Sequence, residues 1–294
     1  MAKTRRPFIV RFFKWIFGTV LTLAILVAGF CAFLKIKYDI SVTSTIKQMK
    51  ILNEPINESE VYTNKFADSD KDAAMLKMNA NIPNFITYSE TDGYKISSSA
   101  TANAGEFLIL LSDKQIGALV QIVLDNQEQK PTITVGDKQI ELELVQIAFS
   151  NINENGDADV NIVVKFDISF LKEQMTSFPT KYLAKYIPST LYVSSTVRVA
   201  KDSSSSFKYD ISSTELTINK LDKTQTSSFL KTISHVVNFG TSDELNLMIG
   251  KPFVDALIGN ETANGLTYSL KPLGITDYSF SIIASEKYYV ITKR

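Results

Sequence analysis

Residue types that enzymes commonly use are scarce in this sequence. Its 294 residues include one cysteine, Cys31, and one histidine, His235. Because Cys31 lies in an N-terminal apolar run, the rest of the chain can form no disulfide and offers no cysteine nucleophile or thiolate metal ligand. A histidine-rich metal site is excluded as well. A Ser-His-Asp triad would need His235, which lies beside the apolar stripe of a predicted helix and is expected to be an ordinary helix residue.

Sequence motifs that cradle nucleotides or activate a serine are also missing. The chain contains no G-x-G, no G-x-x-x-x-G-K and no G-x-S-x-G. Two acidic stretches, 68–79 and 151–162, resemble calcium loops but lack glutamate at the twelfth position, so neither predicts a calcium site. Glu141 and Glu143 share one face of a predicted strand and are expected to form a solvated edge. We therefore expect a non-enzymatic protein without a metal or cofactor.

Acidic residues are absent from the first 35 positions. All 31 acids follow residue 35, whereas six of the 31 basic residues lie at or before it. The remainder carries 25 basic and 31 acidic residues and thus a formal charge of −6. Nucleic-acid binding requires a basic face, so this balance argues against a nucleic-acid partner.

The run from Trp15 to Leu34 contains twenty residues without a charge. A helix of that length, at about 1.5 Å per residue, matches a bilayer core of ~30 Å. Basic residues precede the run, which predicts a cytoplasmic N-terminus and an extracytoplasmic remainder. A cleaved signal peptide would have a shorter apolar region. The expected partner is thus the lipid bilayer, and the expected location is the cell membrane, spanned once.

The predicted organisation has four parts. Residues 1–14 form a basic cytoplasmic tail and 15–34 the transmembrane helix. Residues 35–106 form a stalk with peripheral elements, because polar stretches interrupt a moderately apolar segment. Residues 107–294 form the extracytoplasmic domain, which is long enough to bury a core without disulfides.

Apolar periodicity in residues 107–294 predicts both helices and strands. Ser112 and Gln115 form a capping-box signature before a helix. Strands are expected at 139–151 and 158–170, joined by a hairpin at Asn155–Gly156. The remaining expected strands are 191–200, 207–221, 266–270, 278–284 and 288–292. The remaining expected helices are 227–238 and 241–257, with Pro252 kinking or splitting the second.

The periodicity also reveals two irregular strands. The alternation of apolar residues changes phase between Leu144 and Val145 and again near Ser213, which predicts bulges or sharp twists. The fold class expected from these patterns is α+β: a long twisted antiparallel sheet with a few packed helices, after one N-terminal transmembrane helix.

The order of these elements resembles the YpmS-like group of membrane-anchored proteins of Gram-positive bacteria. The resemblance rests on SDKQIGALV, VNIVVKFDI and LTINKLDKTQTSSFLKTI, and covers residues 107–239. In that group the helix motif has asparagine where Gly117 stands here, and a proline precedes the late helix. This chain has no proline between Leu221 and Phe229.

The resemblance further implies a tubular lipid-binding (TULIP-like) fold, in which a sheet and a helix enclose an apolar groove. The expected function is binding of a lipid or another hydrophobic ligand at the cell envelope. The same residues would equally build a solid core, and a scaffolding protein that binds an envelope protein partner is the alternative. The expected groove lining consists of Ile116, Leu119, Val120, Val123, Val160, Ile162, Val164 and Phe166.

Overall fold

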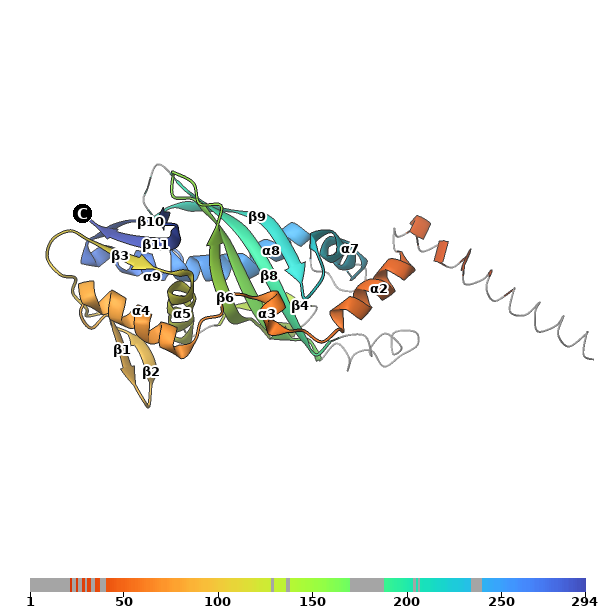
Figure 1. The fold of residues 1–294 in the computed structure, drawn as a ribbon, viewed down its shortest axis with the longest axis horizontal. Coiled ribbons are helices and arrows are strands. Elements are labelled where there is room, and N and C mark those ends of the chain that lie inside the picture. Colours follow the sequence, from red (N-terminus) through yellow and green to blue (C-terminus); the bar gives the residue numbers. More distant parts are fainter. Residues whose placement is uncertain are drawn as a thin grey trace, which may run out of the picture. The chain divides into compact units, whose positions relative to one another are not determined.

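The computed structural model describes residues 41–127, 130–135, 138–169, 188–202, 205, 207–233 and 240–294, with scattered residues between 22 and 37. The chain divides into two units, Met1–Lys50 and Ile51–Arg294, and the second is described here (Figure 1). Trp15, Leu34 and His235 lie outside the described residues. In the described part of the chain, no helix combines the length and the apolar content that a membrane crossing needs.

The second unit mixes helices with antiparallel sheets, as the sequence predicts. Helix α2 (Val42–Leu52) precedes it and ends just inside it. The other helices are α3 (Glu58–Val61), α4 (Asp68–Asn81), α5 (Asp113–Asp125), α7 (Lys223–Ile233), α8 (Ser242–Leu257), α9 (Leu266–Ser269) and the 3₁₀ turn η3 (Lys271–Leu273). The strands are β1 (Ile86–Ser89), β2 (Gly93–Ile96), β3 (Phe107–Leu111), β4 (Thr132–Val135), β5 (Lys138–Glu141), β6 (Glu143–Ser150), β7 (Ala158–Asp167), β8 (Thr190–Lys201), β9 (Tyr209–Ile218), β10 (Ile275–Ile283) and β11 (Glu286–Lys293).

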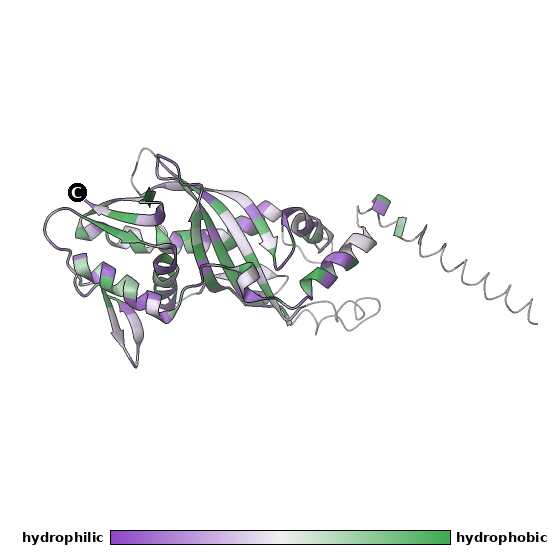
Figure 2. Ribbon diagram, viewed as in Figure 1, coloured by the Kyte–Doolittle hydropathy of each residue, from purple (hydrophilic) through white to green (hydrophobic). Residues whose placement is uncertain are grey.

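The largest described sheet has the order β6-β7-β8-β9, an antiparallel meander. Apolar and polar residues alternate along its strands, which appear as green and pale bands in Figure 2. Val164 pairs with Val193, and Val160 pairs with Val197, so their side chains share the buried inner face. The alternation therefore sets the register, since a slip of one residue would turn this apolar face toward solvent.

Both predicted irregularities are confirmed as register shifts. In β6 the shift lies between Leu144 and Gln146, so the inner face continues at Ile147. In β9 it lies opposite Thr196 and Val197, where Glu215 and Ser213 are the successive partners. A bulge adds local twist to a strand, and the two bulges lie on the two edge strands of this sheet.

Three expectations about individual elements differ from the structure. The predicted strand 139–151 is two strands, β5 and β6, separated at Leu142; β5 pairs with β4 instead of β7. Of the two alternatives predicted for Pro252, the split is wrong, because α8 continues through this residue; the kink stays a prediction. Residues 266–269 form the helical turn α9 instead of a strand. Leu266 and Leu270 are both buried, and their spacing of four residues fits one turn of helix.

Helix α8 lies against the inner face of the main sheet, where it packs on β7, β8 and β9. Thr241 caps it by accepting a hydrogen bond from the Glu244 backbone N–H at 3.1 Å. Gly250 allows a close approach, because a Cβ there would lie 2.8 Å from Val197 Cγ1. The buried Asn246 donates to the backbone oxygen of Thr196 at 2.9 Å. Packing and polar contacts together fix α8 on the sheet.

A second sheet has the order β10-β11-β3. Its inner face contributes an aromatic cluster in which Phe280 lies 4.9 Å and Tyr289 6.5 Å from Phe149 of β6, measured between ring centroids. Tyr278 stacks on Tyr289 at 5.6 Å. These rings join the two sheets into one core, because Phe149 belongs to the main sheet and the others to the second.

The segment 35–106, expected to be a stalk with peripheral elements, includes α3, α4, β1 and β2. Its residues from Ile51 onward belong to the same unit as 107–294. Helix α4 packs against α5 and β3, and it buries Ala74 and Met78. Phe85 and Ile86 follow as buried residues at the start of the β1–β2 hairpin. The described part of this segment thus contributes to the core.

Candidate functional site

Helix α5 carries four of the predicted lining residues, and all four are buried. Ser112 and Gln115 form the predicted capping box, in which the Ser112 backbone N–H donates to Gln115 Oε1 at 3.1 Å. The helix packs against α4, β6 and α8. Ile116, Leu119 and Val120 are fully enclosed by these neighbours. Val123, in the last turn of α5, also lines a surface cleft.

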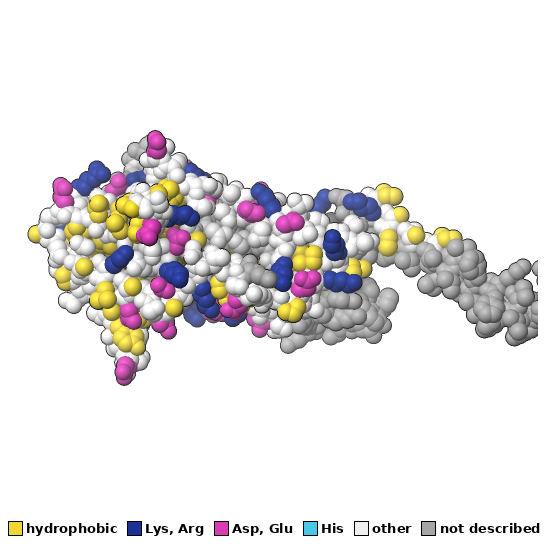
Figure 3. Space-filling view, in the orientation of Figure 1, with side chains coloured by type: hydrophobic (Ala, Val, Ile, Leu, Met, Phe, Trp, Pro, Cys, Tyr) yellow, Lys and Arg dark blue, Asp and Glu magenta, His cyan; other side chains and the backbone are white. Residues whose placement is uncertain are grey.

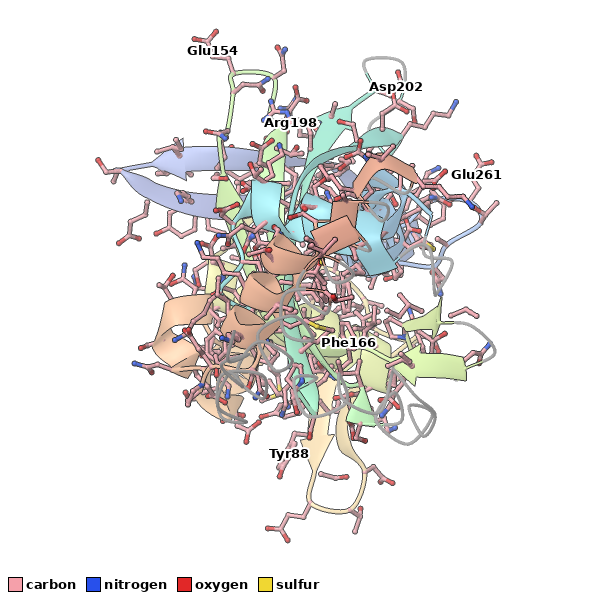
Figure 4. The ribbon with its side chains drawn as sticks, turned by 90° about the vertical axis from the view of Figure 1, so that its right-hand side faces the viewer. Tyr88, Glu154, Phe166, Arg198, Asp202 and Glu261 are labelled. Carbon is pink, nitrogen blue, oxygen red and sulfur yellow. The ribbon has the colours of Figure 1, made fainter. Side chains whose placement is uncertain are left out.

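The four predicted lining residues on β7 share the inner face of the main sheet. Val160, Ile162, Val164 and Phe166 are all buried there, and Figure 4 shows Phe166 among other side chains in the interior. Helix α8 packs against β7 on this face, whereas α5 packs against β6. The two predicted sets therefore belong to one core, and Val123 is the member that this core shares with the cleft.

The cleft at Val123 has a volume of about 630 Å³, within the ~300–1,000 Å³ range of ligand pockets in proteins. One wall comes from the C-terminal end of α5 and the segment around β2, and the other from residues 264–273. Its lining residues are Phe85, Ile96, Ser97, Ser98, Val123, Asn126, Gln127, Asn264, Gly265, Leu266, Tyr268, Ser269, Lys271, Pro272 and Leu273. We call this the α5–α9 cleft.

Two asparagines fix the β1–β2 hairpin beside the cleft. Asn79 of α4 donates to the backbone oxygen of Ile86 at 2.7 Å and accepts from its N–H at 3.0 Å. Asn126, the C-cap of α5, donates to the Tyr94 oxygen at 3.0 Å and accepts from the Ile96 N–H at 3.4 Å. Each side-chain amide thus satisfies strand backbone groups that would otherwise need a partner strand. The hairpin projects from the body, with Tyr88 on it (Figure 4).

The opposite wall is anchored by buried polar contacts. Thr267 of α9 donates to the Leu257 backbone oxygen at 3.0 Å, and its hydroxyl lies 2.7 Å from that of Tyr289. The Tyr268 backbone N–H donates to Ile258 at 2.8 Å. Pro272 lies in the first turn of η3, where its missing N–H costs no helical hydrogen bond. Helix α9 therefore has a fixed position relative to the end of α8.

Lys271 is the charged member of the cleft lining. Its Nζ lies 5.4 Å from the ring centroid of Tyr268 and 5.8 Å from that of Phe207. The two rings meet edge to face, with centroids 5.9 Å apart. A cation over aromatic faces is attracted by the ring quadrupole. This attraction places the ammonium group at the edge of an otherwise uncharged cleft.

A second cleft, of about 330 Å³, lies on the outer face of the main sheet near α3. Tyr62, Val145, Val163 and Tyr192 form a small apolar cluster there. Both tyrosine hydroxyls donate to Glu58, that of Tyr192 at 3.0 Å.

Hydrogen bonding and burial shift three pKa values at this second cleft. Donation from Tyr62 and then Tyr192 lowers the pKa of Glu58. Burial, followed by the bond to Glu58, raises the pKa of both tyrosines. Lys65 lies 3.8 Å from Glu58, and Lys165 lies 3.5 Å from Glu143. Opposite charges are thus paired here, and the site offers no charge in excess.

The stretches that resemble calcium loops have other roles. Asp68 and Asp70 form the first turn of α4, and Asp70 accepts from the Ala67 backbone N–H at 2.8 Å. Asn153 organises the β6–β7 turn by accepting from the backbone N–H groups of Asn155 and Asp157, each at 3.0 Å. Among the residues that the structure describes, no three His, Cys, Asp or Glu side chains gather as metal ligands.

Glu141 and Glu143 are exposed on two successive strands, as expected for a solvated edge. Glu141 forms an ion pair with Lys130 at 2.6 Å.

Sequence reasoning identified Val123 but missed the rest of the cleft. Asn126 and the wall at 264–273 come from segments far apart in the chain, which one segment's periodicity cannot connect. The asparagine after α5 was the available signal, since an amide at a helix C-terminus often satisfies backbone groups.

Comparisons with models of protein families, with curated proteins and with solved structures gave no match. The site is therefore interpreted from its own chemistry.

Proposed function

We propose that this protein is a non-enzymatic, membrane-anchored extracytoplasmic protein that binds a lipid or other hydrophobic ligand in the α5–α9 cleft. The observation that carries the proposal is the cleft itself, which combines ligand-sized volume with accessible apolar walls from Ile96, Tyr268 and Leu273. Uncharged polar groups from Asn126 and Ser97 lie among these walls. An apolar lining with a few polar groups is the usual composition of a small-molecule pocket.

The location follows from the N-terminal sequence. The uncharged run 15–34, preceded by basic residues, supports a single span that leaves the cleft outside the cytoplasm. A ligand-binding unit tethered in this way would stay close to the bilayer, the main source of hydrophobic ligands in a cell envelope.

Native mass spectrometry of residues 51–294 tests ligand binding, after cooperative unfolding has confirmed that this unit folds. A copurifying lipid, or a bound acyl probe, is expected. Ser98→Trp places a large side chain at an exposed position of the lining and should weaken probe binding by at least about tenfold, which corresponds to roughly 1.4 kcal/mol. Ser89→Trp, on the hairpin but outside the lining, is the matched control. If the wild-type unit carries no lipid and binds no acyl probe, the proposal is wrong.

A scaffolding role is the second candidate, and exposed apolar residues favour it. Leu76 of α4 is 68% exposed and Leu108 of β3 is 59% exposed, and α4 packs beside β3. Hydrophobic side chains gather over this end of the molecule in Figure 3. The double variant Leu76→Ser/Leu108→Ser should then abolish association with an envelope protein while leaving probe binding intact, as measured by cross-linking in cells.

A further inference from the structure

The α5–α9 cleft has an unbalanced charge. Among the described residues that line it, Lys271 is charged and none is a carboxylate. Some other described lysines form ion pairs, such as Lys130 with Glu141 and Lys165 with Glu143, whereas others, such as Lys77 and Lys287, donate to backbone oxygens. Lys271 has no carboxylate within ion-pair distance among the described residues; its contacts are the rings of Phe207 and Tyr268.

The position of Lys271 favours interaction with an anion. Aromatic rings neutralise none of its charge, and they exclude water from one side of the ammonium group. An anion within ~4 Å of an ammonium at a protein surface is attracted more strongly than in bulk water, because the neighbouring protein lowers the effective dielectric constant. A neutral ligand could accept only an ordinary hydrogen bond from this group, which is weaker than the bond an anion would accept.

Resting on the proposed function, we infer that the ligand of the α5–α9 cleft is an amphiphile with a single anionic group, a carboxylate or a phosphate monoester, which pairs with Lys271. The apolar body lies against Ile96, Tyr268 and Leu273. The anionic group lies at the rim, where Lys271 is exposed and solvent can still reach the ligand's remaining oxygens. The single positive charge selects against cationic ligands.

Photoaffinity labelling of the full chain in phosphatidylcholine nanodiscs tests this inference. The probes are three eight-carbon compounds with the same diazirine: octanoic acid, octyl phosphate and octanol. Labelled peptides are mapped by mass spectrometry, and labelling at cleft residues is measured as a function of probe concentration. We expect both anionic probes to label cleft peptides at concentrations about fivefold lower than the alcohol does, an effect in the range of one exposed ion pair.

Variants at one position separate charge from shape. Lys271→Gln should raise the half-saturating concentration of both anionic probes about fivefold and leave the alcohol unchanged. Lys271→Arg should retain anion preference, and Lys271→Glu should reverse it. Lys114→Gln removes an exposed lysine at the opposite end of α5 and should change nothing. A difference between the two anionic probes would identify the headgroup.

The outcomes distinguish this inference from the proposed function. If all three probes label the cleft equally and Lys271→Gln has no effect, the anion inference is overturned while the hydrophobic cleft stands. If no probe labels cleft peptides, both fail. Anion labelling that Lys271→Gln and Lys114→Gln reduce equally would reflect general surface charge and would also overturn the inference.

Discussion

Ala284 and Ser285 form the turn between β10 and β11 with backbone angles that side chains disfavour. Their φ values are 52° and 69°, and left-handed geometry costs a residue with a Cβ about 1–2 kcal/mol. Asn-Gly is the preferred pair for a two-residue turn of this kind. Ala284→Asn/Ser285→Gly should therefore raise the free energy of unfolding of residues 51–294 by about 1 kcal/mol. Urea denaturation measures it, with Ser285→Ala as a control that keeps the strain and should give no gain.

Asp113 makes stability depend on pH. Burial raises the pKa of its carboxyl to about 6, although the positive charge of Lys287 and a hydrogen bond to the backbone of Phe149 act to lower it. Its Oδ1 is buried and has no hydrogen-bond partner among the residues that the structure describes. Because the folded-state pKa lies above the ordinary value of 3.8, the unfolded chain loses its proton first. The free energy of unfolding should then fall as pH rises from about 4 to about 6.

Asp113→Asn should remove this pH dependence. Solvent reaches part of the carboxyl, and the charge also favours the start of α5, so the expected gain at pH 7 is only about 1 kcal/mol. Asp68→Asn, at the exposed first position of α4, should instead lose about 0.3–0.5 kcal/mol. Thermal unfolding at pH 4, 5, 6 and 7 measures both. An unchanged slope in Asp113→Asn would show that another group titrates.

At the level of elements, helices α8 and α5 each contain a glycine that packs closely against a neighbour, but only the neighbours of Gly250 in α8 are fixed in place. A Cβ at Gly250 would lie 2.8 Å from Val197 Cγ1 and 2.9 Å from Ser195 Oγ, both in the centre of the sheet. A Cβ at Gly117 of α5 would also meet an atom at 2.8 Å, but that atom is on the half-buried ring of Phe66, which can move.

The same substitution should therefore have opposite effects in the two helices. Gly250→Ala should destabilise by about 1–3 kcal/mol, because the core must rearrange. Gly117→Ala should be neutral or stabilise by up to about 1 kcal/mol, because alanine favours helix. Chemical denaturation compares them, and Val197→Ala should partly rescue Gly250→Ala in a double-mutant cycle. Equal losses in both helices would contradict this account of α8.

The sequence patterns that succeeded were those of single elements. The capping box at Ser112 and the phase change at Leu144 each depend on neighbours within one strand or helix, so local physics sets them. The strand predicted at 266–270 was wrong. Buried residues four positions apart, such as Leu266 and Leu270, fit the two-residue period of a strand as well as one turn of a helix. Thr267, between them, is also buried and is hydrogen-bonded to Tyr289, which favours the helix. The sequence does not reveal this contact, because the two residues are far apart in the chain.

Most of the candidate site could not be predicted from the sequence, because it too depends on contacts between distant segments. Its lining joins residues 85–98, the end of α5 and residues 264–273. Ile162 and Leu119, for which both a groove lining and a solid core were predicted as alternatives, are buried, because a sheet face and its covering helix exclude solvent when they pack well. Periodicity identifies the buried face of an element but does not show where packing leaves space.

At the level of the whole molecule, the charge asymmetry of the N-terminus predicts how the chain lies in the membrane. The basic residues before Trp15 should stay in the cytoplasm, so the α5–α9 cleft would face outward. The single cysteine makes this measurable: Cys31→Ser yields a cysteine-free background into which one reporter can be placed. Glu154 lies in the β6–β7 turn, at the outline of the molecule in Figure 4, and Thr4 lies before the apolar run.

In this background, Glu154→Cys should react with a membrane-impermeant maleimide in intact cells. Thr4→Cys should react only after the cells are permeabilised, because the bilayer separates it from the reagent. Both variants should remain in the membrane fraction, since a span of twenty uncharged residues is not removed as a signal peptide would be. Reaction of Thr4→Cys in intact cells would show that the orientation is the opposite of the one predicted. Release of the Glu154→Cys protein into the medium would show that the N-terminal segment is cleaved. Reversal would place the cleft on the cytoplasmic side of the membrane, and cleavage would separate it from the bilayer, so either result would contradict the location in the proposed function.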